Sequence, residues 1–150
     1  MRILIFAVCL YSLAHFGNTK VYGCECIEKK LKQFYDLPNL IEKMEVVVFS
    51  GRVIQQVKSG DKDKTLIKFQ VYDSWKNATS HELSVIAQPD SNSCGYDFKT
   101  GKAYLVVAYR VGDKYETSLC TPTRELSRSK KLMQELDRIV QKKRIRTSHK

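Results

Sequence analysis

The sequence predicts a mainly β domain that is stapled by disulfides. Three observations predict it. Five segments rich in β-branched and aromatic residues are separated by polar turns, helical periodicity is confined to two short stretches, and the cysteines are even in number once a leader is set aside. A chain of 150 residues accommodates one ordinary hydrophobic core, so we expect a single domain.

Residues 1–23 have the pattern of a secretory signal peptide. Arg2 precedes an apolar run over residues 3–14, and Gly23 ends a short polar region. The apolar run is about half of the ~20 residues that a membrane-spanning helix requires, so we expect a cleaved leader and no membrane span. The mature protein is therefore expected to begin at Cys24 and to be secreted and extracellular.

Cleavage leaves four cysteines, Cys24, Cys26, Cys94 and Cys120, because Cys9 is removed with the leader. A bond between Cys24 and Cys26 would close a strained ring around one intervening residue. Each of these two is therefore expected to pair with Cys94 or Cys120, in an order that the residues leave open. Chain starts normally fray, so two bridges at this start indicate that its position matters; simple stapling of a small secreted domain is the alternative.

Five segments carry the strand pattern. The first, residues 45–57, contains Gly51, which indicates a bulge or sharp bend in one long strand. Four further strands are expected over residues 66–75, 81–87, 102–110 and 114–119. Four aromatic side chains alternate with valines and are interpreted as barrel core rather than as a ligand site: Phe49, Trp75, Tyr96 and Tyr104.

Helical periodicity occurs near the two ends of the mature chain. Residues 27–35 predict a short amphipathic helix that Pro38 interrupts. Near the other end, Ser127 or Ser129 is expected to cap a helix with one apolar stripe, formed by Leu132, Leu136, Ile139 and Val140. Five antiparallel strands with a bent first strand and a helix near each end predict an OB-fold antiparallel β-barrel with two disulfides over residues 24–150.

The charge of the chain favours some partners over others. The formal net charge is +10, and a basic cluster near the end fits heparan-type polyanions, with a solvated helix end as the alternative: Lys142, Lys143, Arg144 and Arg146. OB barrels often bind single-stranded nucleic acid, but the leader argues against such a partner. Asn77 begins a glycosylation sequon, Asn77-Ala78-Thr79.

The residue pattern gives little support to catalysis. His81 is the only histidine inside the expected fold, and the cysteines are assigned to disulfides. No Ser/His/Asp or metal-ligand spacing occurs. We therefore expect a protein that is not an enzyme and has no cofactor of its own.

Four motifs carry a resemblance to a known family. They are Cys24-x-Cys26 at the mature start, Phe49-Ser-Gly-Arg-Val, Ser93-Cys-Gly-Tyr96, and Leu119-Cys120 with Leu126-Ser127 shortly after. This set resembles the N-terminal, netrin-like (NTR) domain of the tissue inhibitors of metalloproteinases, over essentially residues 24–145. The resemblance implies the disulfides Cys24 with Cys94 and Cys26 with Cys120.

The resemblance also implies a mechanism, which is inhibition of zinc metalloproteinases of the matrix-metalloproteinase or a related class. The α-amine and backbone carbonyl of Cys24 would chelate the catalytic zinc of the target protease and displace its hydrolytic water. The inhibitory contact would be formed by the mature start and by the segment before Cys94, that is by Cys24, Glu25, Cys26, Ile27, Ser91, Asn92 and Ser93.

The chain departs from the family in three features. The third bridge of this domain and the separate six-cysteine domain are missing, and Glu25 stands where the family usually carries threonine or serine. A carboxylate near the catalytic glutamate of a zinc protease is repelled, and burying it unpaired is unfavourable, so we expect narrow or weak inhibition. The rival interpretation is a secreted netrin-like module that inhibits nothing and binds a matrix, growth-factor or host protein.

Overall fold

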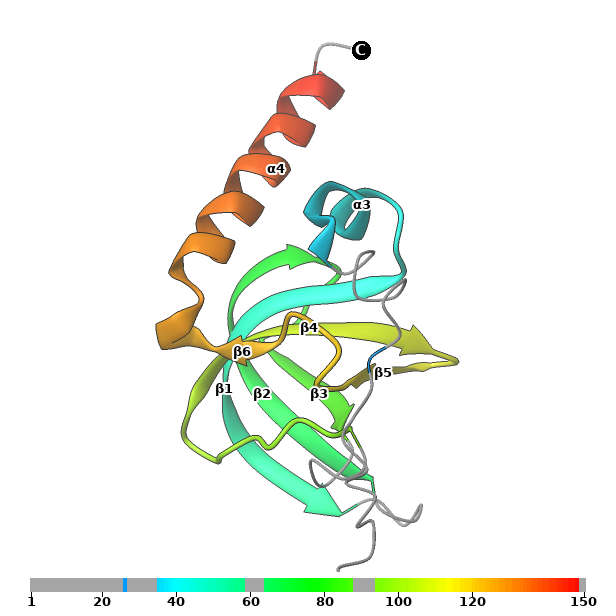
Figure 1. Ribbon diagram of the computed structural model, residues 1–150, viewed down its shortest axis with the longest axis vertical. Coiled ribbons are helices and arrows are strands. Elements are labelled where there is room, and N and C mark those ends of the chain that lie inside the picture. Colours follow the sequence, from blue (N-terminus) through cyan, green and yellow to red (C-terminus); the bar gives the residue numbers. More distant parts are fainter. Residues whose placement is uncertain (1–25, 27–34, 59–63, 88–93, 149–150) are drawn as a thin grey trace, which may run out of the picture.

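The structure, a computed structural model, describes residues 26, 35–58, 64–87 and 94–148, and within them it is mainly β (Figure 1). A short helix precedes the strands and a long helix follows them. The helices are α3 (Leu37–Glu42) and α4 (Lys130–Ser148), with a 3-10 turn, η2 (Leu126–Arg128), before the second. The strands are β1 (Val46–Lys58), β2 (Thr65–Lys76), β3 (Glu82–Ala87), β4 (Ala103–Val111), β5 (Lys114–Thr117) and β6 (Arg124–Glu125).

Five of the strands close into a barrel. They follow the order β1-β2-β3-β5-β4, and β4 pairs with β1 to complete the circle. All of these ladders are antiparallel except β3 with β5, which run parallel, with Ala87 opposite Thr117. The expected OB-type barrel is therefore confirmed, with one parallel pairing that the sequence pattern did not indicate. The short β6, also not expected, adds to β4.

Strand β1 bends so that it can pair along both of its edges. Gly51 lies opposite Val71 of β2 and Tyr104 of β4, and the β1–β2 register shifts between Ser50 and Gly51. A Cβ atom at position 51 would lie 2.6 Å from the carbonyl oxygen of Gln70, closer than van der Waals contact permits. The bend predicted at Gly51 is confirmed, and its cause is the close approach of two backbones.

The inside of the barrel is filled largely by aromatic rings. Phe69 stands edge-on to Phe49 and to Phe98, with ring centroids 5.3 Å apart in both pairs. Tyr104 contacts Phe98 edge-on at 4.9 Å. Tyr96 is partly buried against the same cluster. Edge-to-face pairs of this kind stabilise a core beyond the area that they bury.

A second core lies outside the barrel, between its wall and the two helices. Leu136 of α4 is fully buried there, and Leu40 of α3 lies in the same cluster. Trp75 belongs to this outer core, so its assignment to the barrel interior was wrong. The indole Nε1 of Trp75 donates a 2.7 Å hydrogen bond to Asp137 of α4. A side chain that faced the interior of the barrel could not reach Asp137. The bond holds α4 against β2.

The early helix begins differently from the sequence interpretation, whereas the terminal helix begins where it was expected. Pro38 lies in the first turn of α3, where its missing N–H leaves no hydrogen bond unmade, so it starts a helix rather than ending one. The helix predicted over residues 27–35 falls almost wholly outside the described residues. Helix α4 begins directly after Ser129, one of the two serines expected there: the Ser129 carbonyl accepts from the Met133 N–H at 2.9 Å, and its hydroxyl donates to the Glu125 carbonyl at 2.8 Å.

We predict that Gly51→Ala lowers the free energy of unfolding by about 3 kcal/mol, because the new methyl group overlaps the Gln70 carbonyl. Gly112→Ala is the matched control, since Gly112 has a positive φ of 61° but open space around it. It should cost only about 1 kcal/mol, the strain of a left-handed alanine. Urea unfolding measures both changes, and equal losses would contradict the steric explanation.

Candidate functional site

A disulfide joins the start of the described chain to the barrel. Cys26 is bonded to Cys120, 94 residues later, with 5.5 Å between their Cα atoms. Cys120 follows strand β5, so the bond fixes a residue near the expected mature terminus to the barrel wall. The pairing of these two cysteines that the resemblance implies is therefore confirmed.

Cys94 lies beside this disulfide. The backbone N–H of Leu119 donates to the carbonyl oxygen of Cys94 at 3.0 Å, so the segments that carry Cys94 and Cys120 are neighbours. Cys94 is also disulfide-bonded. We call Cys26, Cys94 and Cys120 the cysteine platform. The predicted bond between Cys24 and Cys94 falls on residue 24, which lies outside the described residues.

Three buried threonines hold the segment around Cys120 against strand β4. The hydroxyl oxygens of Thr117, Thr121 and Thr123 lie 2.9–3.0 Å from one another. Val107 of β4 donates its N–H to Thr123, and its carbonyl accepts from Thr117 and Thr123. Such a network is strong because each buried polar group in it finds a partner, and it holds the turn on either side of Cys120 against β4.

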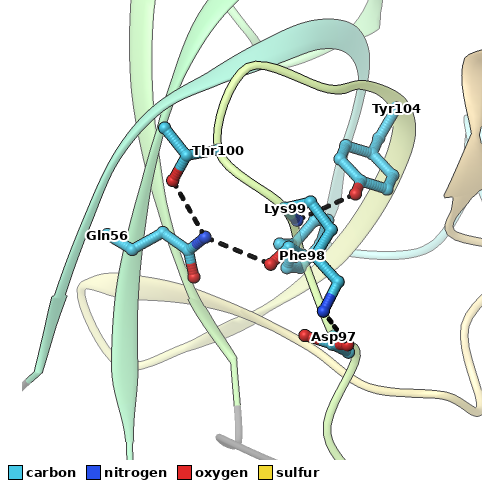
Figure 2. Close-up of polar contacts among 6 residues, drawn as sticks. All are labelled: Gln56, Asp97, Phe98, Lys99, Thr100 and Tyr104. Atoms are coloured by element: carbon cyan, nitrogen blue, oxygen red, sulfur yellow. Dashed lines mark hydrogen bonds and ion pairs between the residues drawn. The ribbon is translucent and has the colours of Figure 1, made fainter.

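The segment that follows Cys94 is held in place by the buried side chain of Phe98 and by hydrogen bonds around it (Figure 2). Phe98 enters the barrel interior and is only 3% exposed. Around it, the N–H of Lys99 donates to the Tyr104 hydroxyl at 2.9 Å, and the Gln56 amide donates to the Phe98 carbonyl and to Thr100 at 3.1 Å each. Burial raises the pKa of Tyr104, so its phenol stays protonated. The loop after Cys94 is thus fixed by its own core residue.

The remaining predicted contact residues are not all placed by the structure. Cys26, Cys94 and Cys120 are brought together, whereas six others lie outside the described residues: Cys24, Glu25, Ile27, Ser91, Asn92 and Ser93. The sequence analysis did not identify the residues that hold the cysteine platform in place, which are the three threonines and Phe98. The close spacing of Thr117, Thr121 and Thr123 was the one local signal for a hydroxyl cluster.

Two further sequence features have positions in the structure. Asn77 is exposed in the turn between β2 and β3 with φ 59°, and its Nδ2 donates to the Val46 carbonyl at 2.8 Å. Asparagine tolerates this left-handed conformation better than most residues. His81 is exposed and lies just before β3, which begins one residue later than predicted.

Within the described residues, no group of three or more histidine, cysteine or acidic side chains is arranged to hold a metal ion. None of the helices described there is both long and apolar enough to cross a membrane. No protein-family model matches the chain, and no curated protein is significantly similar to it. The arrangement can hold a chain segment in a fixed position.

We predict that Thr123→Val lowers the free energy of unfolding by about 2 kcal/mol, because the Val107 N–H loses its buried acceptor. Thr147→Val is the control, since that hydroxyl bonds carbonyls on an exposed part of α4 and its loss should change stability by less than about 0.5 kcal/mol. Thermal or urea unfolding measures both, and equal effects would show that the threonine cluster does not support the platform.

Proposed function

We propose that the protein is a secreted inhibitor of zinc metalloproteinases and that Cys24 supplies the inhibitory group. One observation carries the proposal, which is the cysteine platform. Two cysteines separated by one residue, such as Cys24 and Cys26, lie at most about 7 Å apart in an extended chain. The cysteines to which they are bonded must therefore also lie close together. Cys94 and Cys120 do lie close together, because Leu119 is hydrogen-bonded to Cys94.

A terminus held in this way suits a zinc ligand. A catalytic zinc keeps one coordination position open for water, and an amine with its own carbonyl can close a five-membered chelate there. The pKa of a free α-amine is about 7.7 to 8.0, so zinc displaces its proton more easily than it would from a lysine. Because the disulfides order the terminus beforehand, little conformational entropy is lost on binding.

Two motifs behind the family resemblance have physical roles in the fold. Phe49-Ser-Gly-Arg-Val spans the bend of β1, where Gly51 allows the strand to pair on both edges. Tyr96, in Ser93-Cys-Gly-Tyr96, packs on Phe98 with centroids 4.7 Å apart and helps to fix the loop after Cys94. These roles support a netrin-like interpretation, since both serve the platform rather than a separate site.

Glu25 narrows the proposed target range. The side chain following the chelating residue would point toward the specificity pocket of the protease. A carboxylate there is repelled by the catalytic glutamate of the enzyme and is unfavourable to bury without a basic partner. We therefore propose a target whose pocket carries such a partner, or weak inhibition of other enzymes.

We predict that the protein beginning at Cys24 inhibits a zinc endopeptidase and that one extra alanine before Cys24 abolishes inhibition. The added residue converts the amine into an amide, which cannot coordinate zinc. Inhibition constants against a panel of zinc endopeptidases measure the effect. Removal of the alanine with an aminopeptidase is the control and should restore inhibition, and peptide mapping should find the Cys26–Cys120 disulfide intact in both forms. Equal inhibition by both forms would refute the chelation mechanism.

We also predict that Glu25→Thr tightens or broadens inhibition, by about tenfold where the pocket has no basic partner, which is about 1.4 kcal/mol. Glu25→Gln is the matched variant, because it removes the charge and keeps the size of the side chain. Inhibition constants that stay flat or rise for both variants across the panel would count against the proposed contact. Failure of every form to inhibit would favour the non-inhibitory binding module instead.

A further inference from the structure

Two hollows adjoin at the end of β2: one lies between α3 and α4, and the other is lined by the segment between α3 and β1 and by β4 and β5. The first, of about 330 Å³, is lined by Lys76, Lys143 and Arg144 together with Trp75. The second, of about 260 Å³, is lined by Lys43, Arg110 and again Lys76. Lys76 and Asn77 lie on the rim that both hollows share. We call this surface the basic groove, defined by Lys43, Lys76, Arg110, Lys143 and Arg144.

The positive charge of the basic groove is poorly neutralised. Glu45 is the only carboxylate among the described residues that line the two hollows. None of the ion pairs between described residues involves any of the five cations of the groove. Burial lowers the pKa of Lys76 and the facing Lys143 lowers it further, while Glu45 raises it by a smaller amount. Like charges that face one another in this way repel unless an anion lies between them.

The positive charge of the groove is not explained by the dipole of helix α4 alone. Basic residues in the last turn of a helix are favourable because of the helix dipole, but in α4 that turn contains Arg146, whereas Lys143 and Arg144 lie one turn earlier. The other cations come from three separate places along the chain. Lys43 follows α3, Lys76 ends β2, and Arg110 lies near the end of β4. The fold therefore gathers cations that local sequence does not link.

Helix α4 presents two distinct basic faces. Val140, Lys143, Arg144 and Thr147 line the groove, as their spacing of three and four residues requires. Lys131, Arg138 and Lys142 line a different hollow on the opposite face of the helix. The charged cluster near the end of the chain is thus divided between two surfaces, and only one of them joins cations from other elements.

We propose that the basic groove binds the sulfate groups of a sulfated polysaccharide chain. Two adjoining hollows suit anions repeated along one flexible chain better than they suit a single ion. Trp75 and Val140, which are partly exposed, add apolar surface that the CH face of a sugar ring can contact. A flat lipid surface fits poorly, because the cations line two hollows. One lies between α3 and α4, which stand side by side above the barrel (Figure 1), and the other lies beside the start of β1.

The test uses heparin oligosaccharides and the fluorescence of Trp75, which is the only tryptophan of the chain and lies in the groove. The full secreted chain carries Thr79→Ala in all forms, so that no glycan on Asn77 covers the rim. The groove variant is Lys143→Gln with Arg144→Gln. The matched control is Arg138→Gln with Lys142→Gln, which removes the same charge from two residues that line the hollow on the opposite face of α4.

The groove variant should lose about tenfold in affinity for heparin oligosaccharide and most of the fluorescence change, whereas the control should lose less than about threefold. Affinity should also fall as salt is raised, and less steeply for the groove variant. Circular dichroism verifies that each variant folds. Equal weakening of both variants would overturn the proposal in favour of diffuse charge attraction, and so would the absence of binding at physiological salt.

Two further probes separate heparin from other polyanions. Vesicles containing phosphatidylserine and a single-stranded oligonucleotide of matched charge are titrated under the same conditions. Weaker binding of both probes than of heparin supports a sulfated polysaccharide. Tighter binding of either probe that is lost in the groove variant would overturn the proposal and assign the groove to that partner.

Discussion

The parallel pairing of β3 with β5 is the constraint on which the arrangement of the candidate site depends. Parallel strands end at the same edge of a sheet, so the chain leaves Ala87 and Thr117 from adjacent points. Cys94 comes after the end of β3, and Cys120 comes after the end of β5. The hydrogen bond between Leu119 and Cys94 joins the two segments. An antiparallel closure would have sent them to opposite ends of the barrel.

That pairing depends in turn on the bend of β1. A five-stranded barrel closes only if its first strand pairs on both edges, and the side chain of any residue other than glycine would overlap the Gln70 carbonyl at the bend. The buried hydroxyls of Thr117, Thr121 and Thr123 then secure the exit of β5 to Val107. No buried side-chain polar atom of the described residues lacks a partner, so the platform rests on a satisfied network.

The sequence predicted what is local and missed what is not. Richness in β-branched and aromatic residues, together with polar turns, identified the five barrel strands to within a few residues, because such side chains suit a buried, pleated strand. The parallel closure was not foreseen, since it joins residues about thirty positions apart that carry no joint signal. Trp75 was misplaced because its strand continues past the barrel, where the outer core and Asp137 replace the interior. Pro38 was taken as a helix breaker, although the first turn of a helix accepts it.

The basic groove is also formed by residues that are distant in the sequence, and it is separate from the cysteine platform. Lys76 and Arg110 look like ordinary strand residues in the sequence, and only the fold brings them near Lys143 of α4. Lys76 also donates to the Leu40 carbonyl of α3 at 3.2 Å, so the groove is built around the contact that holds α3 in place. No residue that defines the groove belongs to the platform. Substitutions of groove residues on α4 therefore leave the Cys26–Cys120 disulfide and the threonine network that supports it in place.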